Sequence, residues 1–201
     1  MSDLATQERE KYSDMWTVDA YGEHSPGEKY VSVFMEMISA TRPPETDYKA
    51  IVLDAGCGSG KGALELHRNG FSVRCCDFTN EGLVPQAKKF PFQQVCLWND
   101  LRVQGAANGW EKFDYVYCCD VMEHIPVALT MLVAARLLEV TKRAAFFSIS
   151  FQPDVMGYWI GKPLHETVMP FVWWRDQFNA IGRVTSGRDL LGAGVFLVEP
   201  R

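Results

Sequence analysis

A glycine-rich loop carries the strongest chemical signal in the sequence. Residues 52–60 read VLDAGCGSG, an apolar run that ends in Asp54 and continues into alternating glycines. Glycines at this spacing let a ligand approach the backbone, and a helix expected at 62–67 would aim free amide groups at that ligand. We therefore expect Gly56, Cys57, Gly58 and Gly60 to line a cofactor site.

The residues around this loop restrict the kind of cofactor. The dinucleotide fingerprint G-x-G-x-x-G fails, because counting from Gly56 places Lys61 where the third glycine belongs. The carboxylate of Asp54 would repel a pyrophosphate but attract an ammonium group. The segment resembles the first motif of class I S-adenosylmethionine-dependent methyltransferases, an apolar run, an acidic residue and G-x-G-x-G. Beyond the loop, the resemblance extends only as an order of elements, from Ala50 to about Glu199.

The resemblance assigns further cofactor contacts to the ends of later strands. Asp77, with Phe78 beside it, lies about twenty residues after the loop, where an acidic side chain accepts hydrogen bonds from ribose hydroxyls. Asp100 would accept the adenine amino group while Leu101 packs on the ring, and Asp120 occupies the position of motif IV. Each aspartate alone is more simply explained as a cap or a solvated loop residue. Their joint placement at strand ends favours the site.

A second cluster of polar residues follows Asp120. Residues 120–126 read DVMEHIP, and Asp120, Glu123 and His124 are spaced to converge on one turn. D-x-x-E-H resembles the E-x-x-E-H of small-RNA 2′-O-methyltransferases and, more loosely, of ubiquinone-pathway O-methyltransferases, in which such residues bind a divalent ion. His165 corresponds to a downstream histidine of the RNA enzymes. The resemblance implies a metal site of Asp120, Glu123, His124 and His165, although aspartate shortens the reach of the first ligand.

The same residues have alternative interpretations. Without a metal, His124, His165 or Asp120 is a candidate catalytic group, because methyl transfer to a hydroxyl requires removal of a proton. An imidazole titrates near working pH and suits that task. The E-H pair also occurs in methyltransferases that bind no metal, where it only orients the turn.

Aromatic residues gather in two regions outside the strand pattern. Trp16 and Tyr21 lie near the N-terminus, together with Tyr12, whereas Trp159 and Trp173 lie late in the chain. In the resembled family both regions lie over the cofactor, and these side chains could grip a planar or apolar substrate. The alternative is that they pack against each other and the helices.

The elements that must position these residues alternate between strands and helices from residue 50 onward. Strands are expected at 51–55, 71–76, 95–98, 113–119 and 144–149, and a hairpin at 183–186 and 195–199 around the turn 192–194. Helices are expected from the capping box at 25–28, at 62–67, at 127–140 and at 173–181, with partly helical structure at 12–21. We expect an α/β fold: a Rossmann-like, doubly wound, mostly parallel sheet with helices on both faces and a C-terminal antiparallel hairpin strand.

Composition sets outer limits on function. The 201 residues suit one methyltransferase domain with an N-terminal helical cap region at 1–42, a cofactor-binding core at 50–150 and a substrate-side segment at 151–201. The net charge of −5 and the lack of a basic run disfavour long nucleic acid. The six cysteines lack zinc-type spacing and are expected to be reduced core thiols. With no apolar leader or membrane-spanning stretch, we expect a cytoplasmic protein.

These features favour an S-adenosylmethionine-dependent methyltransferase that acts on a small molecule at oxygen or nitrogen. The alternatives are a metal-dependent RNA 2′-O-methyltransferase, which the acidic charge opposes, and an inactive cofactor-binding interaction protein. The sequence does not identify the acceptor or the oligomeric state.

Overall fold

One mixed sheet organises the chain. The computed structural model describes residues 3–23, 26–40, 49–99 and 112–201. Seven strands within these residues follow the order β3-β2-β1-β4-β5-β7-β6. Their bounds are Ile51–Ala55 (β1), Ser72–Asp77 (β2), Phe92–Gln94 (β3), Phe113–Cys119 (β4), Thr141–Ser150 (β5), Arg183–Asp189 (β6) and Ala193–Glu199 (β7). Strands β1 to β5 run parallel, whereas β7 pairs antiparallel with both β5 and β6. The expected sheet is confirmed.

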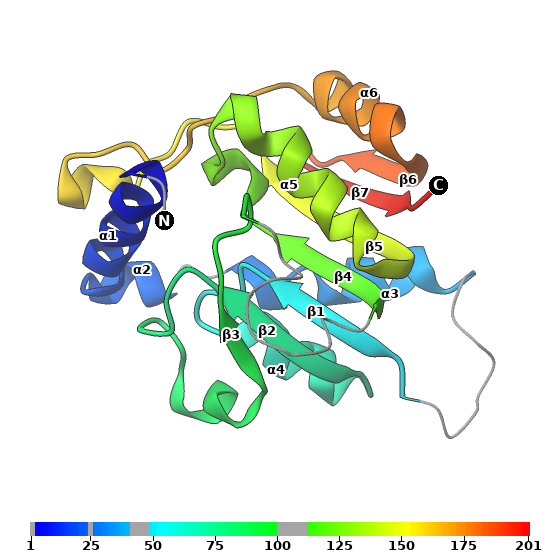
Figure 1. Ribbon diagram of the computed structural model, residues 1–201, viewed down its shortest axis with the longest axis horizontal. Coiled ribbons are helices and arrows are strands. Elements are labelled where there is room, and N and C mark those ends of the chain that lie inside the picture. The colour runs from blue at the N-terminus through cyan, green and yellow to red at the C-terminus, as the bar shows by residue number, and fades with distance from the viewer. Residues whose placement is uncertain (1–2, 24–25, 41–48, 100–111) are drawn as a thin grey trace.

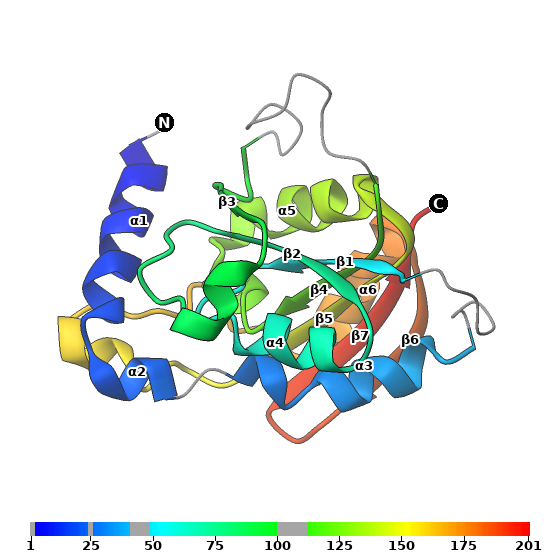
Figure 2. The same cartoon turned by 90° about the horizontal axis from the view of Figure 1, so that it is seen from below.

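Helices cover both faces of this sheet (Figures 1 and 2). The helices Val127–Glu139 (α5) and Phe171–Ile181 (α6) pack on one face, and Val31–Ile38 (α3) and Lys61–Arg68 (α4) pack on the other. Every residue of β4 is buried, as expected for a central parallel strand covered on both sides. Two further helices, Asp3–Trp16 (α1) and Asp19–Glu23 (α2), lie beyond the carboxyl ends of the parallel strands (Figure 1).

This topology brings together the strand ends that carry the predicted site residues. The order of the strands reverses between β1 and β4, which are parallel neighbours although β2 and β3 intervene in sequence. Ligands of open α/β sheets bind at the carboxyl ends of the strands beside such a switch point. Asp54, Asp77 and Asp120 all lie at that edge, at or just after the ends of β1, β2 and β4.

The predicted third strand was wrong in its position. The strand is Phe92–Gln94, and Val95 to Trp98 follow it as an irregular segment. The Val95 amide bonds to the Asp77 carbonyl at 2.8 Å, and a turn closed by the Asn99 amide and the Cys96 carbonyl comes next. The apolar run at 95–98 is buried. Burial of an irregular loop therefore produced the strand-like pattern.

The helix predicted from the capping box also differs. Ser25 lies outside the described residues, and Pro26–Glu28 forms only a 3₁₀ turn (η1) before α3 begins at Val31. The Gly27 carbonyl accepts a hydrogen bond from the Tyr117 hydroxyl rather than continuing a helical ladder. The final turn is also shifted: Leu191 and Gly192 have positive φ, whereas Ala193 and Gly194 belong to β7.

The six cysteines are all free and buried, as the sequence predicted. No helix among the described residues combines the length and the apolar character that crossing a membrane requires. Three more 3₁₀ turns complete the fold: Pro85–Lys89 (η2), Met122–His124 (η3) and Gly157–Ile160 (η4).

Candidate active site

A cavity opens at the carboxyl edge of the sheet, between the strand ends and the N-terminal helices. Its walls come from α1, α2, η1, the glycine loop, the ends of β2 and β4, and the segments after β3 and β4. They are Tyr12, Trp16, Tyr21, Pro26, Gly27, Asp54, Gly56, Cys57, Gly58, Gly62, Asp77, Phe78, Val95, Leu97, Cys119, Asp120, Val121, His124 and Ile125. Most of the residues predicted from the sequence therefore meet at one place.

The glycine loop lies against neighbouring side chains so closely that larger residues would clash. Gly56 has a φ of +72°, and a Cβ there would lie 2.4 Å from a methyl carbon of Val121. Gly58 has a φ of +48°, and a Cβ there would approach the Trp16 ring to 3.1 Å. Both positions need glycine for backbone conformation as well as for space. Gly60, with a φ of +72°, precedes α4 and does not line the cavity.

Two carboxyl groups face the cavity: Asp54 is buried, and Asp77, which is partly buried, also holds the loop. Asp77 accepts hydrogen bonds from the Gly58 amide at 2.8 Å and the Phe78 amide at 2.6 Å. Burial raises the pKa of Asp77 to about 6, although these amides counteract the rise. Burial, with the charge of Asp77, raises the pKa of Asp54 to about 7. Asp54 Oδ2 is buried and has no hydrogen-bond partner among the described residues. That oxygen favours a cationic hydrogen-bond donor.

A third acidic centre forms at the turn after β4. Asp120 has a φ of +58°, in the left-handed region that aspartate tolerates better than most residues. Glu123, on η3, is fully buried, and its Oε1 accepts a hydrogen bond from the Ser150 amide at the end of β5. Burial and the adjacent charge of Asp120 raise the pKa of Glu123 well above its usual range. The turn therefore holds two interacting carboxyl groups next to the cavity.

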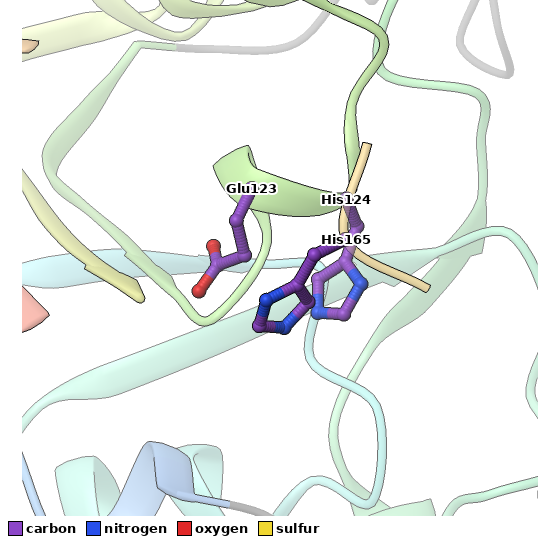
Figure 3. Close-up of side chains that lie close together, drawn as sticks. All are labelled: Glu123, His124 and His165. Atoms are coloured by element: carbon purple, nitrogen blue, oxygen red, sulfur yellow. The ribbon is translucent and has the colours of Figure 1, made fainter. Parts of the chain in front are cut away.

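Two histidines lie beside Glu123 with matching hydrogen bonds (Figure 3). Nδ1 of His124 lies 3.1 Å from the Leu164 carbonyl, and Nδ1 of His165 lies 2.7 Å from the Gln152 carbonyl. Because a carbonyl only accepts, each Nδ1 carries a proton, and Nε2 is the nitrogen of each ring that the carbonyl does not engage. The ring centroids are 4.8 Å apart, and one ligand atom from each of Glu123, His124 and His165 lies within 4.8 Å of the other two.

The environment of His124 determines its protonation state. Burial, as the largest effect, lowers the pKa of this imidazole to about 4, even though the Asp120 charge opposes the change. His124 is therefore neutral near pH 7 and lines the cavity. His165 does not line the cavity and touches it only through the ring of His124.

The predicted substrate aromatics divide into two groups. Trp16 and Tyr21 line the cavity and contact each other edge to face, with ring centroids 4.8 Å apart. Trp159 is 53% exposed on η4, outside the cavity, and stacks near Tyr158. Trp173 packs on Trp174 and the hydrophobic core beneath α6. Only the N-terminal group is therefore positioned to contact a ligand in this cavity.

The structure and the sequence-based prediction of the site differ at several residues. Asp100 and Leu101, predicted to contact the adenine, lie outside the described residues. Asp120 is not part of the three-residue group of metal-ligating atoms, although it adjoins Glu123. Tyr12 lines the cavity but was noted only as one of several aromatics. Its spacing of four residues from Trp16, which places both on one face of α1, was the signal that could have identified it.

Comparison with known proteins assigns the class. A model of the methyltransferase domain family matches residues 28–193, and the chain belongs to that family. The cavity lies at the carboxyl ends of the strands, where ligands of open α/β sheets bind.

Two curated relatives share part of their length with this chain. A ubiquinone biosynthesis O-methyltransferase of Histophilus somni is 29% identical over 158 residues, which are 74% of this chain and 65% of that protein. A protein of the same name from Haemophilus ducreyi is 32% identical over 43% of this chain and 39% of its own length. The chain thus matches less than two thirds of the length of these relatives.

Among solved structures, a Burkholderia thailandensis 1,6-didemethyltoxoflavin-N1-methyltransferase, with its substrate and S-adenosylhomocysteine bound, is similar with a TM-score of 0.67 and 15% identity. That similarity covers 98% of this chain and 87% of the other. A magnesium protoporphyrin IX methyltransferase from Synechocystis with bound S-adenosylmethionine gives 0.60 and 16%, over 86% and 79% of the two chains. At these identities the likeness establishes the fold.

Proposed function

We propose that this chain transfers the methyl group of S-adenosylmethionine to a hydroxyl oxygen of a small molecule. The observation that carries the proposal is Asp54, a buried carboxylate at the mouth of the glycine loop with an oxygen that lacks a partner among the described residues. A cationic group such as the ammonium of the cofactor would satisfy this oxygen. Gly56 and Gly58 line the same cavity, and because they have no side chains their backbone is open to a ligand there.

The remaining residues of the cavity suit the other parts of this cofactor. Asp77 has lone pairs left for ribose hydroxyls after accepting two amides. Phe78, Val95 and Leu97 give an apolar wall for the adenine. When bound, S-adenosylmethionine supplies a methyl group activated by a positively charged sulfur. The methyl–sulfur bond breaks as the methyl–oxygen bond forms, and the hydroxyl proton must leave.

The tasks of the chain are alignment, exclusion of water and removal of that proton. Trp16 and Tyr21 cover the cavity and limit the access of water. Asp120 and His124 lie where the acceptor must be held, because they line the cavity beside the glycine loop. The curated relatives, named as O-methyltransferases, support oxygen as the receiving atom. Free buried thiols support a reducing, cytoplasmic location.

We further propose that Glu123, His124 and His165 hold a divalent cation. Two imidazoles with carbonyl-bonded Nδ1 atoms and a carboxyl group form a donor set that such ions accept. A cation there would lower the pKa of an acceptor hydroxyl. This assignment suits His124 better than direct general-base catalysis, because an imidazole held neutral by burial is a weak proton acceptor.

Calorimetry separates the cofactor assignment from the alternatives. We expect S-adenosylmethionine and S-adenosylhomocysteine to bind with micromolar affinity, and NAD not to bind. Asp54→Ala should weaken both sulfur nucleotides at least ten-fold. Tight binding of NAD without affinity for either sulfur nucleotide would overturn the proposal. A radiolabelled methyl-transfer screen on metabolite extract then distinguishes an enzyme from an inactive binding protein.

Metal removal tests the second proposal. EDTA treatment should lower methyl transfer at least ten-fold, and one of Mg²⁺, Mn²⁺ or Zn²⁺ should restore it. His165→Ala should weaken activation by the restoring metal while leaving binding of S-adenosylhomocysteine unchanged, because His165 does not line the cofactor cavity. Full activity in EDTA, with no response to any of the three ions, would exclude the metal and return His124 to the role of direct base.

A further inference from the structure

The charge of the cavity is unbalanced. Among its described lining residues, three carry carboxylates, Asp54, Asp77 and Asp120, and none is a lysine or an arginine. The lysines nearest to it are occupied: Lys11 Nζ forms ion pairs within α1 and with Glu166, and Lys61 Nζ donates to the Gly22 carbonyl at 3.0 Å. A cationic cofactor complements this field, whereas an anionic acceptor would be repelled by Asp120.

One helix connects the cofactor loop to the acceptor side of the cavity. Trp16 of α1 lies against Gly58 of the loop, where a Cβ would approach its ring to 3.1 Å. Tyr12, one helical turn earlier, contacts His124 edge to face with ring centroids 5.8 Å apart. His124 belongs to the turn after β4 and not to the loop, so Tyr12 lies over the side of the cavity to which the proposed function assigns the acceptor.

The hydroxyl group of Tyr12 lacks a partner in this position. The oxygen is fully buried and forms no hydrogen bond with any described residue. A buried phenol left in this state destabilises the fold, and tyrosine hydroxyls of protein interiors normally have a partner. A phenol hydroxyl can both donate and accept, so this group can donate a hydrogen bond to a ligand.

We propose that Tyr12 recognises the methyl acceptor by donating a hydrogen bond to it, and that this acceptor is an uncharged planar molecule. The donated bond requires an oxygen or nitrogen lone pair on the ligand, and the rings of Tyr12, Trp16 and Tyr21 provide flat apolar walls. The carboxylate of Asp120 selects against acceptors that carry a negative charge. This inference rests on the proposed methyl transfer and adds a substrate class and a specificity-determining residue to it.

The variant Tyr12→Phe tests the hydroxyl, because it removes that group and keeps the ring. Removing a buried group without a partner should leave the melting temperature of the ligand-free protein unchanged or raise it. The affinity for S-adenosylhomocysteine should change less than two-fold, whereas KM for the acceptor should rise about ten-fold. Tyr158→Phe, the same change at a 69% exposed tyrosine outside the cavity, should alter none of these quantities. An unchanged KM, or a lower melting temperature with no effect on KM, would overturn the role of Tyr12.

Pairs of acceptors that differ only in charge test whether the acceptor must be uncharged. Hydroxybenzoic acids, each beside its methyl ester, would be titrated into protein saturated with S-adenosylhomocysteine, in EDTA so that no cation offsets the charge of Asp120. We expect the esters to bind at least ten-fold better than the acids. Equal or better binding of the acids, or no binding of any ester, would reject the inference. Failure of S-adenosylhomocysteine to bind at all would instead reject the proposed function.

Discussion

Asp54 places a carboxylate where ligand binding and protonation compete. Burial and the charge of Asp77 raise its pKa to about 7, so that near neutral pH a large fraction of the ligand-free protein carries a proton there. An ammonium group favours the ionised form, and binding must then release that proton. The affinity for S-adenosylhomocysteine should therefore fall as the pH drops below 7, approaching ten-fold per unit.

Calorimetry in buffers of different ionisation enthalpy measures both quantities. Up to one proton should be released on binding at pH 6.5 and almost none at pH 8.5, because Asp54 is already ionised at the higher pH. Asp54→Asn should bind weakly at every pH without releasing a proton from this site. Asp176→Asn, an exposed carboxylate on α6, serves as the control and should match the wild type. Affinity that is constant between pH 6 and 8 would contradict this role for Asp54.

At the level of elements, the buried Lys11 of α1 pairs within its helix and also with an exposed glutamate of a later segment. Lys11 Nζ lies 2.6 Å from Glu8 Oε2 and 3.3 Å from Glu166 Oε1. The amides of Glu166 and Thr167 in turn bond to the Glu123 carbonyl, at 2.8 and 2.9 Å. The position of the helix that carries Tyr12 and Trp16 is thus coupled to the turn after β4.

Breaking this attachment should loosen the helix. Lys11→Met keeps an apolar stem but leaves Glu8 buried without its cation, which is the costly way to break such a pair. We expect amide hydrogen exchange in α1 to accelerate at least ten-fold, while exchange in β4 and β5 stays slow. Lys142→Met, a change at an exposed lysine of β5, should leave exchange in α1 unaltered. Slow exchange in α1 of Lys11→Met would show that apolar packing alone holds the helix.

The elements also show how far the sequence could predict this structure. Strands β1 and β4 and helix α5 were recognised within one residue of their bounds, because apolar runs, glycines and prolines mark their ends. The run at 95–98 failed because burial makes a loop as apolar as a strand. The site residues, like the strands, were predictable only where a local sequence pattern marks them. Asp54, Asp77 and Asp120 were found because they end strands, whereas the exclusion of Trp159 and Trp173 from the cavity depends on packing between distant segments.

For the whole molecule, a cavity built from carboxylates lowers the stability of the ligand-free state. The pKa of Asp54 is raised to about 7 and that of Asp77 to about 6, both mainly through burial, whereas unfolded aspartates titrate near 4. The folded protein thus binds these protons more tightly than the unfolded chain. Their contribution to stability is fully present below the unfolded pKa and is lost as the pH rises through the folded values.

The free energy of unfolding of the ligand-free protein should consequently decrease between about pH 5 and pH 7.5, by up to about 1.4 kcal/mol per pH unit for each group. Asp54→Asn should remove part of this slope and, at pH 8, should be more stable than the wild type by on the order of 2 to 4 kcal/mol. Urea denaturation at several pH values measures these differences, and Asp176→Asn should follow the wild-type curve. At one fixed concentration, S-adenosylhomocysteine should stabilise the wild type at pH 8 more than it stabilises Asp54→Asn, since only the wild type has the carboxylate that pairs with the ligand. If Asp54→Asn were less stable than the wild type at pH 8, Asp54 would support the fold and not mainly the ligand.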